Sequence, residues 1–109
     1  PYFTSPEHTA MAREKLGKDS WLCVEQKVIL EKDPTKARET AKQTAAIYKG
    51  LPNYRNNWIR MGLAEEDIDS LNDKFIDTTF AWGTEAAIRE RISAHFDAGA
   101  DHVCIQPVN

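Results

Sequence analysis

Two short apolar segments near opposite ends of the chain constrain its fold more than any other feature. Residues 21–30 and 102–105 are rich in β-branched and apolar side chains and are separated by a long stretch of helical periodicity. Strands joined by a helical crossover lie parallel, with a right-handed connection. A parallel sheet needs several strands and cover on both faces. The sequence therefore predicts an α/β fold with two neighbouring parallel strands, which needs further strands to be complete.

Helix start and stop signals divide the remaining residues into about five helices. Ser5 and Pro6 begin the first, Asp33 caps the second, and Thr84 caps the last. In the second helix, Ala37 and Ala41 belong to a narrow apolar face that allows close packing on a sheet. The predicted helical ranges are 6–16, 34–48, 54–61, a turn at 63–68, 72–82 and 85–98.

Composition restricts the class of protein. The 109 residues suffice for one domain, and the net charge of −3 with interspersed signs argues against a nucleic-acid partner. The chain has no apolar run of the roughly 20 residues that span a bilayer, and no signal peptide is recognisable. Two widely spaced cysteines, Cys23 and Cys104, favour a reducing environment. We expect a soluble, cytoplasmic protein without a membrane partner.

The first residues indicate that further strands complete the sheet. The chain begins at Pro1 rather than Met, and Tyr2-Phe3 reads as the exit from a preceding element. We therefore expect residues 1–109 to form a single partial domain. The missing strands would come from an N-terminal portion or from another copy of the chain. Unpaired strand edges also predict self-association into a homo-oligomer.

Several motifs, in their order and spacing, resemble the C-terminal portion of luciferase-like oxidoreductases that use the deazaflavin coenzyme F-420. They are His8-Thr9-Ala10 within residues 6–13, Glu25-Gln26, residues 51–57, residues 81–85 and the Gly99-Ala100-Asp101-His102-Val103 entry to the last strand. The resemblance covers essentially the whole chain. It implies the end of a (β/α)8 TIM-type barrel, with hydride transfer between the deazaflavin ring and a small organic substrate.

The resemblance also implies where a site would lie. Active sites of such barrels form at the carboxyl ends of the strands, which here brings in Tyr2 and Gln106 as candidate coenzyme-binding residues and Tyr54 and Arg55 as candidate substrate-binding residues. The early strands and a Gly-rich phosphate-binding turn carry most of the coenzyme pocket in this family, and the chain has neither. We expect the chain alone to be inactive, to lack a catalytic residue and to bind no coenzyme.

Other chemically active side chains have simpler interpretations. His8, His95 and His102 lack the spacing of metal ligands, so His8 is expected at a helix start facing solvent, and His95 as amphipathic cover. Both cysteines are expected as buried thiols in the two strands. The acidic run at residues 65–69 lacks the glycine and spaced oxygens of a calcium loop and predicts a solvated helix start.

Two other functions stay open. The chain could be a non-enzymatic, self-associating assembly module. It could also belong to a barrel of the same fold that uses riboflavin phosphate for monooxygenation, since the discriminating residues would lie upstream.

Overall fold

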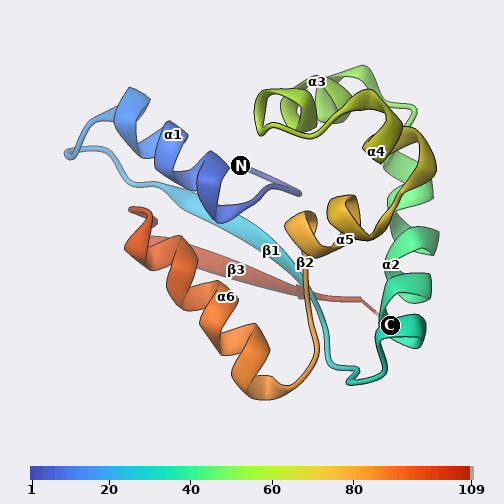
Figure 1. Cartoon of the computed structure of the whole chain (residues 1–109). Coiled ribbons are helices and arrows are strands. Elements are labelled where there is room, and N and C mark those ends of the chain that lie inside the picture. Colours follow the sequence, from blue (N-terminus) through green and yellow to red (C-terminus); the bar gives the residue numbers. More distant parts are fainter. Residues whose placement is uncertain (109) are drawn as a thin grey trace.

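Residues 1–108, which the computed structural model describes, form six helices and a three-stranded parallel sheet. In chain order the elements are α1 (Pro6–Leu16), β1 (Cys23–Ile29), α2 (Pro34–Tyr48), α3 (Pro52–Arg60), α4 (Glu65–Ser70), α5 (Asp73–Thr79), β2 (Phe80–Trp82), α6 (Glu85–Asp97) and β3 (His102–Pro107) (Figure 1). The α/β class predicted from the sequence is confirmed.

The sheet has the order β2-β1-β3, with both neighbouring pairs parallel. Cys23 on β1 lies opposite His102 on β3, and Lys27 on β1 lies opposite Phe80 on β2. The prediction that the first and last strands are parallel neighbours is confirmed. The predicted count of two strands is wrong, because β2 is a third.

The third strand was hidden inside a predicted helix. The sequence predicts a helix over residues 72–82, yet the helix ends at Thr79, and Phe80 has extended backbone angles, φ −113 and ψ 142. The chain turns here to pair with residues 27–29 of β1, and the Gly83 N–H then donates to the Ile29 carbonyl at 3.1 Å. Backbone partners on β1 thus override a local helical periodicity.

Local signals place the starts of α1, α2 and α6 as predicted, whereas α3 begins at Pro52 instead of residue 54. The Ser5 hydroxyl accepts from the His8 N–H, the Asp33 carboxylate from the N–H groups of Thr35 and Lys36, and the Thr84 hydroxyl from the Ala87 N–H. On α2, the apolar face consists of alanines that are fully buried, at positions 37, 41 and 45. Their burial confirms the predicted apolar face, which packs mainly against α5 rather than directly on the sheet.

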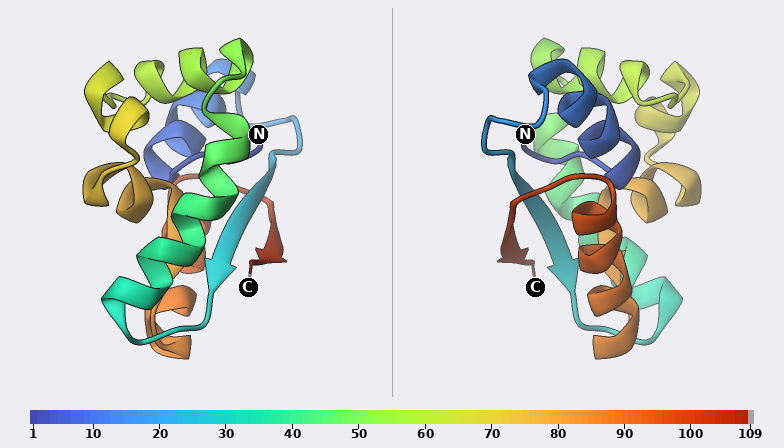
Figure 2. Two further views of the ribbon diagram at one scale, coloured as in Figure 1. Left: turned by 90° about the vertical axis from the view of Figure 1, so that its right-hand side faces the viewer. Right: turned by 90° about the vertical axis from the view of Figure 1, so that its left-hand side faces the viewer.

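Helices lie on both sides of the sheet. In Figure 1, α1 and α6 lie on the left of the strands, while α2, α3, α4 and α5 gather at the right and top. Figure 2 shows α6 running beside β1 and β3. Phe3, Trp58, Phe75 and Phe80 belong to the main core, which lies on the side of α2 to α5. A smaller core contains Leu22, Val24 and Ala100.

Part of the sheet face opposite α6 has no helix over it. Cys23 and Cys104, which were predicted to be buried, are both exposed there as free thiols. Most of β3 is exposed as well, and Ile105, on the face toward α6, is 49% accessible. Burial of the two thiols, as predicted, would require a further element over this part of the sheet, and residues 1–108 do not supply one. Within the same residues, no helix has the length and apolarity needed to cross a membrane.

Candidate functional site

A buried ion pair lies on the sheet face that α2 and the residues before α1 cover. Glu25 and Lys27 are two positions apart on β1, so their side chains leave the same face. Lys27 Nζ lies 2.5 Å from Glu25 Oε2, and the two residues are 1% and 7% exposed. A charged group this deep is tolerated only when it is paired and hydrogen-bonded. Each charge therefore depends on the other.

Aromatic rings enclose the ammonium group. Lys27 Nζ lies 3.7 Å from the ring centroid of Tyr2, 4.5 Å from that of Phe3 and 5.5 Å from that of Tyr48. Ring faces carry partial negative charge, which stabilises a desolvated cation. The rings thus replace part of the hydration that Lys27 loses on folding.

Polar groups continue this cluster toward the sheet edge. The Tyr2 hydroxyl donates to Gln106 Oε1 at 3.0 Å, and Lys27 Nζ donates to the same oxygen at 3.3 Å. The Tyr48 hydroxyl lies 3.5 Å from that of Tyr2. This hydrogen bond, together with burial, raises the pKa of Tyr48. Tyr48 therefore keeps its proton at neutral pH. The five residues Tyr2, Glu25, Lys27, Tyr48 and Gln106 are called the Lys27 cluster below.

Three of the four site residues that the sequence singles out lie together. Tyr2 and Gln106 are hydrogen-bonded, and the Tyr54 ring lies 6.1 Å from the Tyr2 ring. Arg55 does not join them, because its guanidinium lies 2.9 Å from Asp69 Oδ1. Sequence reasoning missed Lys27 and Tyr48. Polar residues inside an apolar strand are a signal that could have identified Lys27.

The segment before α1 is held in place by an unusual residue. Phe3 has φ 62, a left-handed conformation that is rare for a bulky side chain. Its N–H donates to Glu25 Oε1 at 3.1 Å, and its carbonyl accepts from Trp58 Nε1 at 2.9 Å. Its ring packs edge-on against Trp58 and Phe80, each 5.2 Å away. These contacts hold the backbone in its strained state and fix Tyr2 beside Lys27.

A second polar network lies on the opposite face of the sheet. His95 on α6 is fully buried, which overturns its assignment as amphipathic cover. Its Nδ1 lies 2.8 Å from the Thr9 hydroxyl, and its Nε2 lies 2.8 Å from Gln26 Oε1. The Gln26 amide in turn donates to the carbonyls of Lys27 and Thr79. This network ties α1, α6, β1 and the end of α5 together.

The network fixes the protonation of His95. Burial, followed by the charge of Arg91, lowers the pKa of His95 from 6.5 to about 4, although Glu7 opposes this. The ring is therefore neutral at pH 7. Since Gln26 uses its amide N–H groups elsewhere, its Oε1 must accept from His95 Nε2–H, and Nδ1 then accepts from the Thr9 hydroxyl. Every polar atom of the ring has a partner, as expected for a structural histidine.

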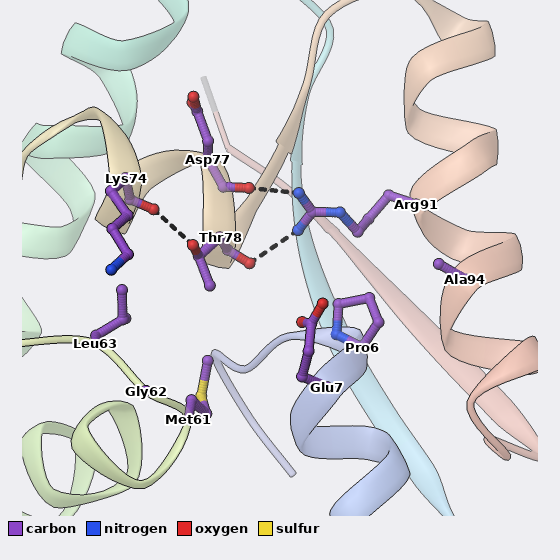
Figure 3. Close-up of a pocket in the computed structure, with 10 residues that line it drawn as sticks. All are labelled: Pro6, Glu7, Met61, Gly62, Leu63, Lys74, Asp77, Thr78, Arg91 and Ala94. Atoms are coloured by element: carbon purple, nitrogen blue, oxygen red, sulfur yellow. Dashed lines mark hydrogen bonds between the residues drawn. The ribbon is translucent and has the colours of Figure 1, made fainter.

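A pocket of about 430 Å³ lies between α1, α5 and α6, and Figure 3 shows its lining. Arg91 reaches across it and donates to the backbone carbonyls of Asp77 and Thr78, at the negative end of α5. Glu7 and Lys74 add charges of both signs. The Arg91 guanidinium is committed to these carbonyls, and the other charges of the pocket have both signs. The pocket therefore shows no preference for a positively or a negatively charged ligand.

The acidic run begins α4 as predicted, and Glu65, Glu66 and Asp69 are exposed. Asp67 differs from the prediction, because it is 6% exposed and accepts from the Ala64 N–H at 3.0 Å and from Asn72 Nδ2 at 2.7 Å. It thus stabilises the turn between α4 and α5. Among residues 1–108, no three His, Cys, Asp or Glu side chains converge as a metal site would require.

Comparisons with models of known protein families, with curated proteins and with solved structures give no match to this chain. The Lys27 cluster and the arrangement of the parallel strands therefore carry the functional argument.

Proposed function

We propose that this chain is the C-terminal part of a luciferase-like oxidoreductase barrel of the deazaflavin branch. In that role it forms one wall of a pocket in which hydride passes between the coenzyme and a small organic substrate. The observation that supports this best is the meeting of Tyr2, Tyr54 and Gln106 on one face of a parallel sheet. Ligand sites of parallel α/β folds lie at the carboxyl ends of their strands, and Gln106 is the second-last residue of β3.

The chemistry of these side chains fits the ring of such a coenzyme. Tyr2 and Gln106 can exchange hydrogen bonds with carbonyl and N–H groups at a ring edge, and Tyr54 offers a flat apolar surface. Lys27 is committed to Glu25 and enclosed by aromatic rings, so it would position Tyr2 and Gln106 rather than touch a ligand. The hydride chemistry itself would belong to the coenzyme.

The open part of the sheet is consistent with this proposal. Within residues 1–108, β2 and β3 each have only β1 as a neighbour. The exposed positions Cys23, His102 and Cys104 lie on the face of the Lys27 cluster, by the alternation of side chains along β1 and β3. In a closed barrel the uncovered part of this face would point inward, and further strands would continue both edges.

The proposal is tested by NMR titration of the ¹⁵N-labelled chain with the deazaflavin riboside, the ring portion of the coenzyme. The whole coenzyme is not expected to bind, because the chain lacks a Gly-rich phosphate turn, but its ring portion should make contacts of about millimolar affinity. Shifts should concentrate at residues 2, 54 and 106 and weaken in Tyr2→Phe and Gln106→Leu. Arg55→Leu is the control, because Arg55 points toward Asp69. Shifts spread over the surface, or none at all, would contradict the proposal.

The same titration with riboflavin phosphate addresses the related monooxygenase alternative. Stronger shifts at the three residues with this ligand than with the deazaflavin would favour that branch. A non-enzymatic assembly module remains the second candidate function, favoured by the exposed edge strand β3. It predicts oligomers without ring-specific shifts.

A further inference from the structure

A surface pocket between α1 and α3 has a lining that none of the functions above explains. It measures about 550 Å³, within the range of small-molecule sites. His8, Met11 and Lys15 line it from α1, while Asn57 and Arg60 face them from α3. His8 Nε2 and Asn57 Oδ1, 3.1 Å apart, join the two helices at one end. The pocket thus lies between two helices that this hydrogen bond joins.

The electrostatic character of this pocket is positive. Among residues 1–108, neither Lys15 nor Arg60 has a carboxylate within ion-pair distance. Six other basic side chains do: Arg13, Lys27, Arg38, Arg55, Lys74 and Arg89. Burial lowers the pKa of His8, the hydrogen bond to Asn57 opposes this, and the positive charges of the N-terminus, Lys15 and Arg60 lower it further. The lining itself contains no acidic residue.

The remaining lining is apolar. Met11 is 38% exposed and Leu16 48% exposed, and Ala12 lies between them on the same helix. Large apolar side chains beside unpaired cations suit a ligand that has both an apolar part and a negative charge. An inorganic ion would leave the apolar surface in water.

Helix polarity limits the charge of such a ligand. Lys15 and Leu16 are the last residues of α1, and Arg60 is the last residue of α3. Both helices therefore point their partly negative carboxyl ends toward the cationic end of the pocket. Phosphate groups favour the opposite geometry, in which helix amino ends face the anion. A singly charged carboxylate, held by side chains alone, fits better than a doubly charged phosphate.

We propose that the pocket binds a small aliphatic carboxylate, with its charged group between Lys15 and Arg60 and its hydrocarbon part on Met11 and Leu16. This site is separate from the Lys27 cluster, so it does not depend on the proposed oxidoreductase function.

Sodium octanoate is the probe, followed by calorimetry and by NMR shifts of the full chain below its micelle concentration. We expect saturable binding, shifts at residues 11, 15, 16 and 60, and affinity at least tenfold lower in Arg60→Met. Lys18→Met removes a nearby cation outside the pocket and should leave affinity unchanged. Arg60 and Lys18 are both exposed, so neither variant should disturb folding, which circular dichroism would verify.

Two matched ligands separate charge from apolarity. 1-Octanol has the same chain without the charge and should bind at least tenfold more weakly, while inorganic phosphate should not saturate the site. Equal binding of octanol, preferential binding of phosphate, unchanged octanoate affinity in Arg60→Met, or no saturable octanoate binding would each overturn the proposal.

Discussion

At the scale of single residues, the Glu25–Lys27 pair places two opposite charges where water does not reach. Removing one partner leaves the other charge buried and unpaired, which costs much more than the pair contributes as a whole. The rings of Tyr2 and Phe3 stabilise a cation at this position but offer nothing to an isolated carboxylate. The two residues should therefore respond to mutation as a unit.

Lys27→Met should lower the free energy of unfolding by about 3–5 kcal/mol. The control is Arg89→Met, which breaks the exposed Arg89–Glu85 pair, whose side chains are 76% and 74% accessible. That loss should stay below about 1 kcal/mol. Urea unfolding measures both. Adding Glu25→Gln to Lys27→Met should recover part of the loss, and a double variant no more stable than Lys27→Met alone would argue against charge burial as the cause.

His95 should make stability depend on pH. Its pKa is about 4 in the folded protein and 6.5 when unfolded, so the unfolded state binds more protons between these values. Stability is therefore complete above pH 6.5 and falls as the pH falls toward 4, by up to about 3 kcal/mol. The lowered pKa values of Asp67, Asp77 and Asp101 act below 3.8, outside this window.

Urea unfolding at pH 7 and pH 5 checks this dependence. His95→Gln should reduce the difference between the two pH values, because the buried ring no longer titrates. His102→Gln, which alters an exposed histidine on β3, should keep it. An equal pH difference in the wild type and His95→Gln would assign the effect to other groups, with half-buried His8 the first to test.

At the scale of elements, the end of α6 packs tightly against α1 through a glycine. Gly99 has φ 115, and a Cβ built there would lie 2.7 Å from Arg13 Cγ. Arg13 cannot move away easily, since it donates to the carbonyls of Gly99, Gly17 and Ser20 and pairs with Asp101. One arginine thus joins α1 to the start of β1 and β3.

Gly99→Ala should therefore cost more than a positive φ alone explains. The matched control is Gly62→Ala, where φ is 101 and a Cβ would meet nothing within 4 Å. We expect Gly62→Ala to destabilise the protein by about 1–2 kcal/mol through backbone strain. Gly99→Ala should carry the same strain and lose about 1–3 kcal/mol more through overpacking. Thermal or urea unfolding measures both, and equal losses would mean that Arg13 yields without cost.

The elements also show which information is local in this sequence. Helix starts at Ser5, Asp33 and Thr84 were predictable because each cap lies within three residues of the N–H that it accepts. Strand β2 was not, because Phe75, Ile76, Thr79 and Phe80, all buried in the structure, share a spacing that also fits one continuous helix. Pairing with the backbone of residues 27–29 of β1 decides between the two. The residues around position 80 carry no information about that distant partner.

The candidate site divides in the same way. Tyr2 and Gln106 were identified through the family resemblance, and the structure brings them into contact across 104 positions. Arg55 was grouped with Tyr54 because they are adjacent, but consecutive helical residues point in different directions. The burial of His95 depends on Gln26, which is 69 positions away. Such pairings follow from the tertiary arrangement and have no signature in the neighbouring residues.

At the scale of the whole molecule, the exposed edge of β3 should drive association. Ile105 borders an apolar groove formed with Ile88 and Ile92 of α6, and β3 has only one neighbouring strand among residues 1–108. Unprotected edge strands next to apolar surface favour pairing with another chain.

We expect light scattering to give a mass above that of one chain, and Ile105→Lys to shift it toward the monomer. Lysine at an edge strand is a common protection against pairing. Ile47→Lys changes an equally apolar residue on the outer side of α2, 74% exposed, and should leave the mass unchanged. A wild-type monomer that melts cooperatively would refute association through this edge.

The left-handed residue Phe3 has a consequence for the order of folding. Its backbone and ring contact Glu25, Trp58 and Phe80, partners that are brought together only when β1, α3 and β2 have assembled. Contacts between distant parts of a chain form at the cost of loop closure and tend to be slow. Docking of residues 1–4 should thus be a late event in refolding, after the sheet and its helices have formed. The Phe3 carbonyl accepts from the Trp58 indole, so stopped-flow tryptophan fluorescence would detect that step. If docking follows the transition state, Phe3→Leu should leave the refolding rate unchanged and speed unfolding.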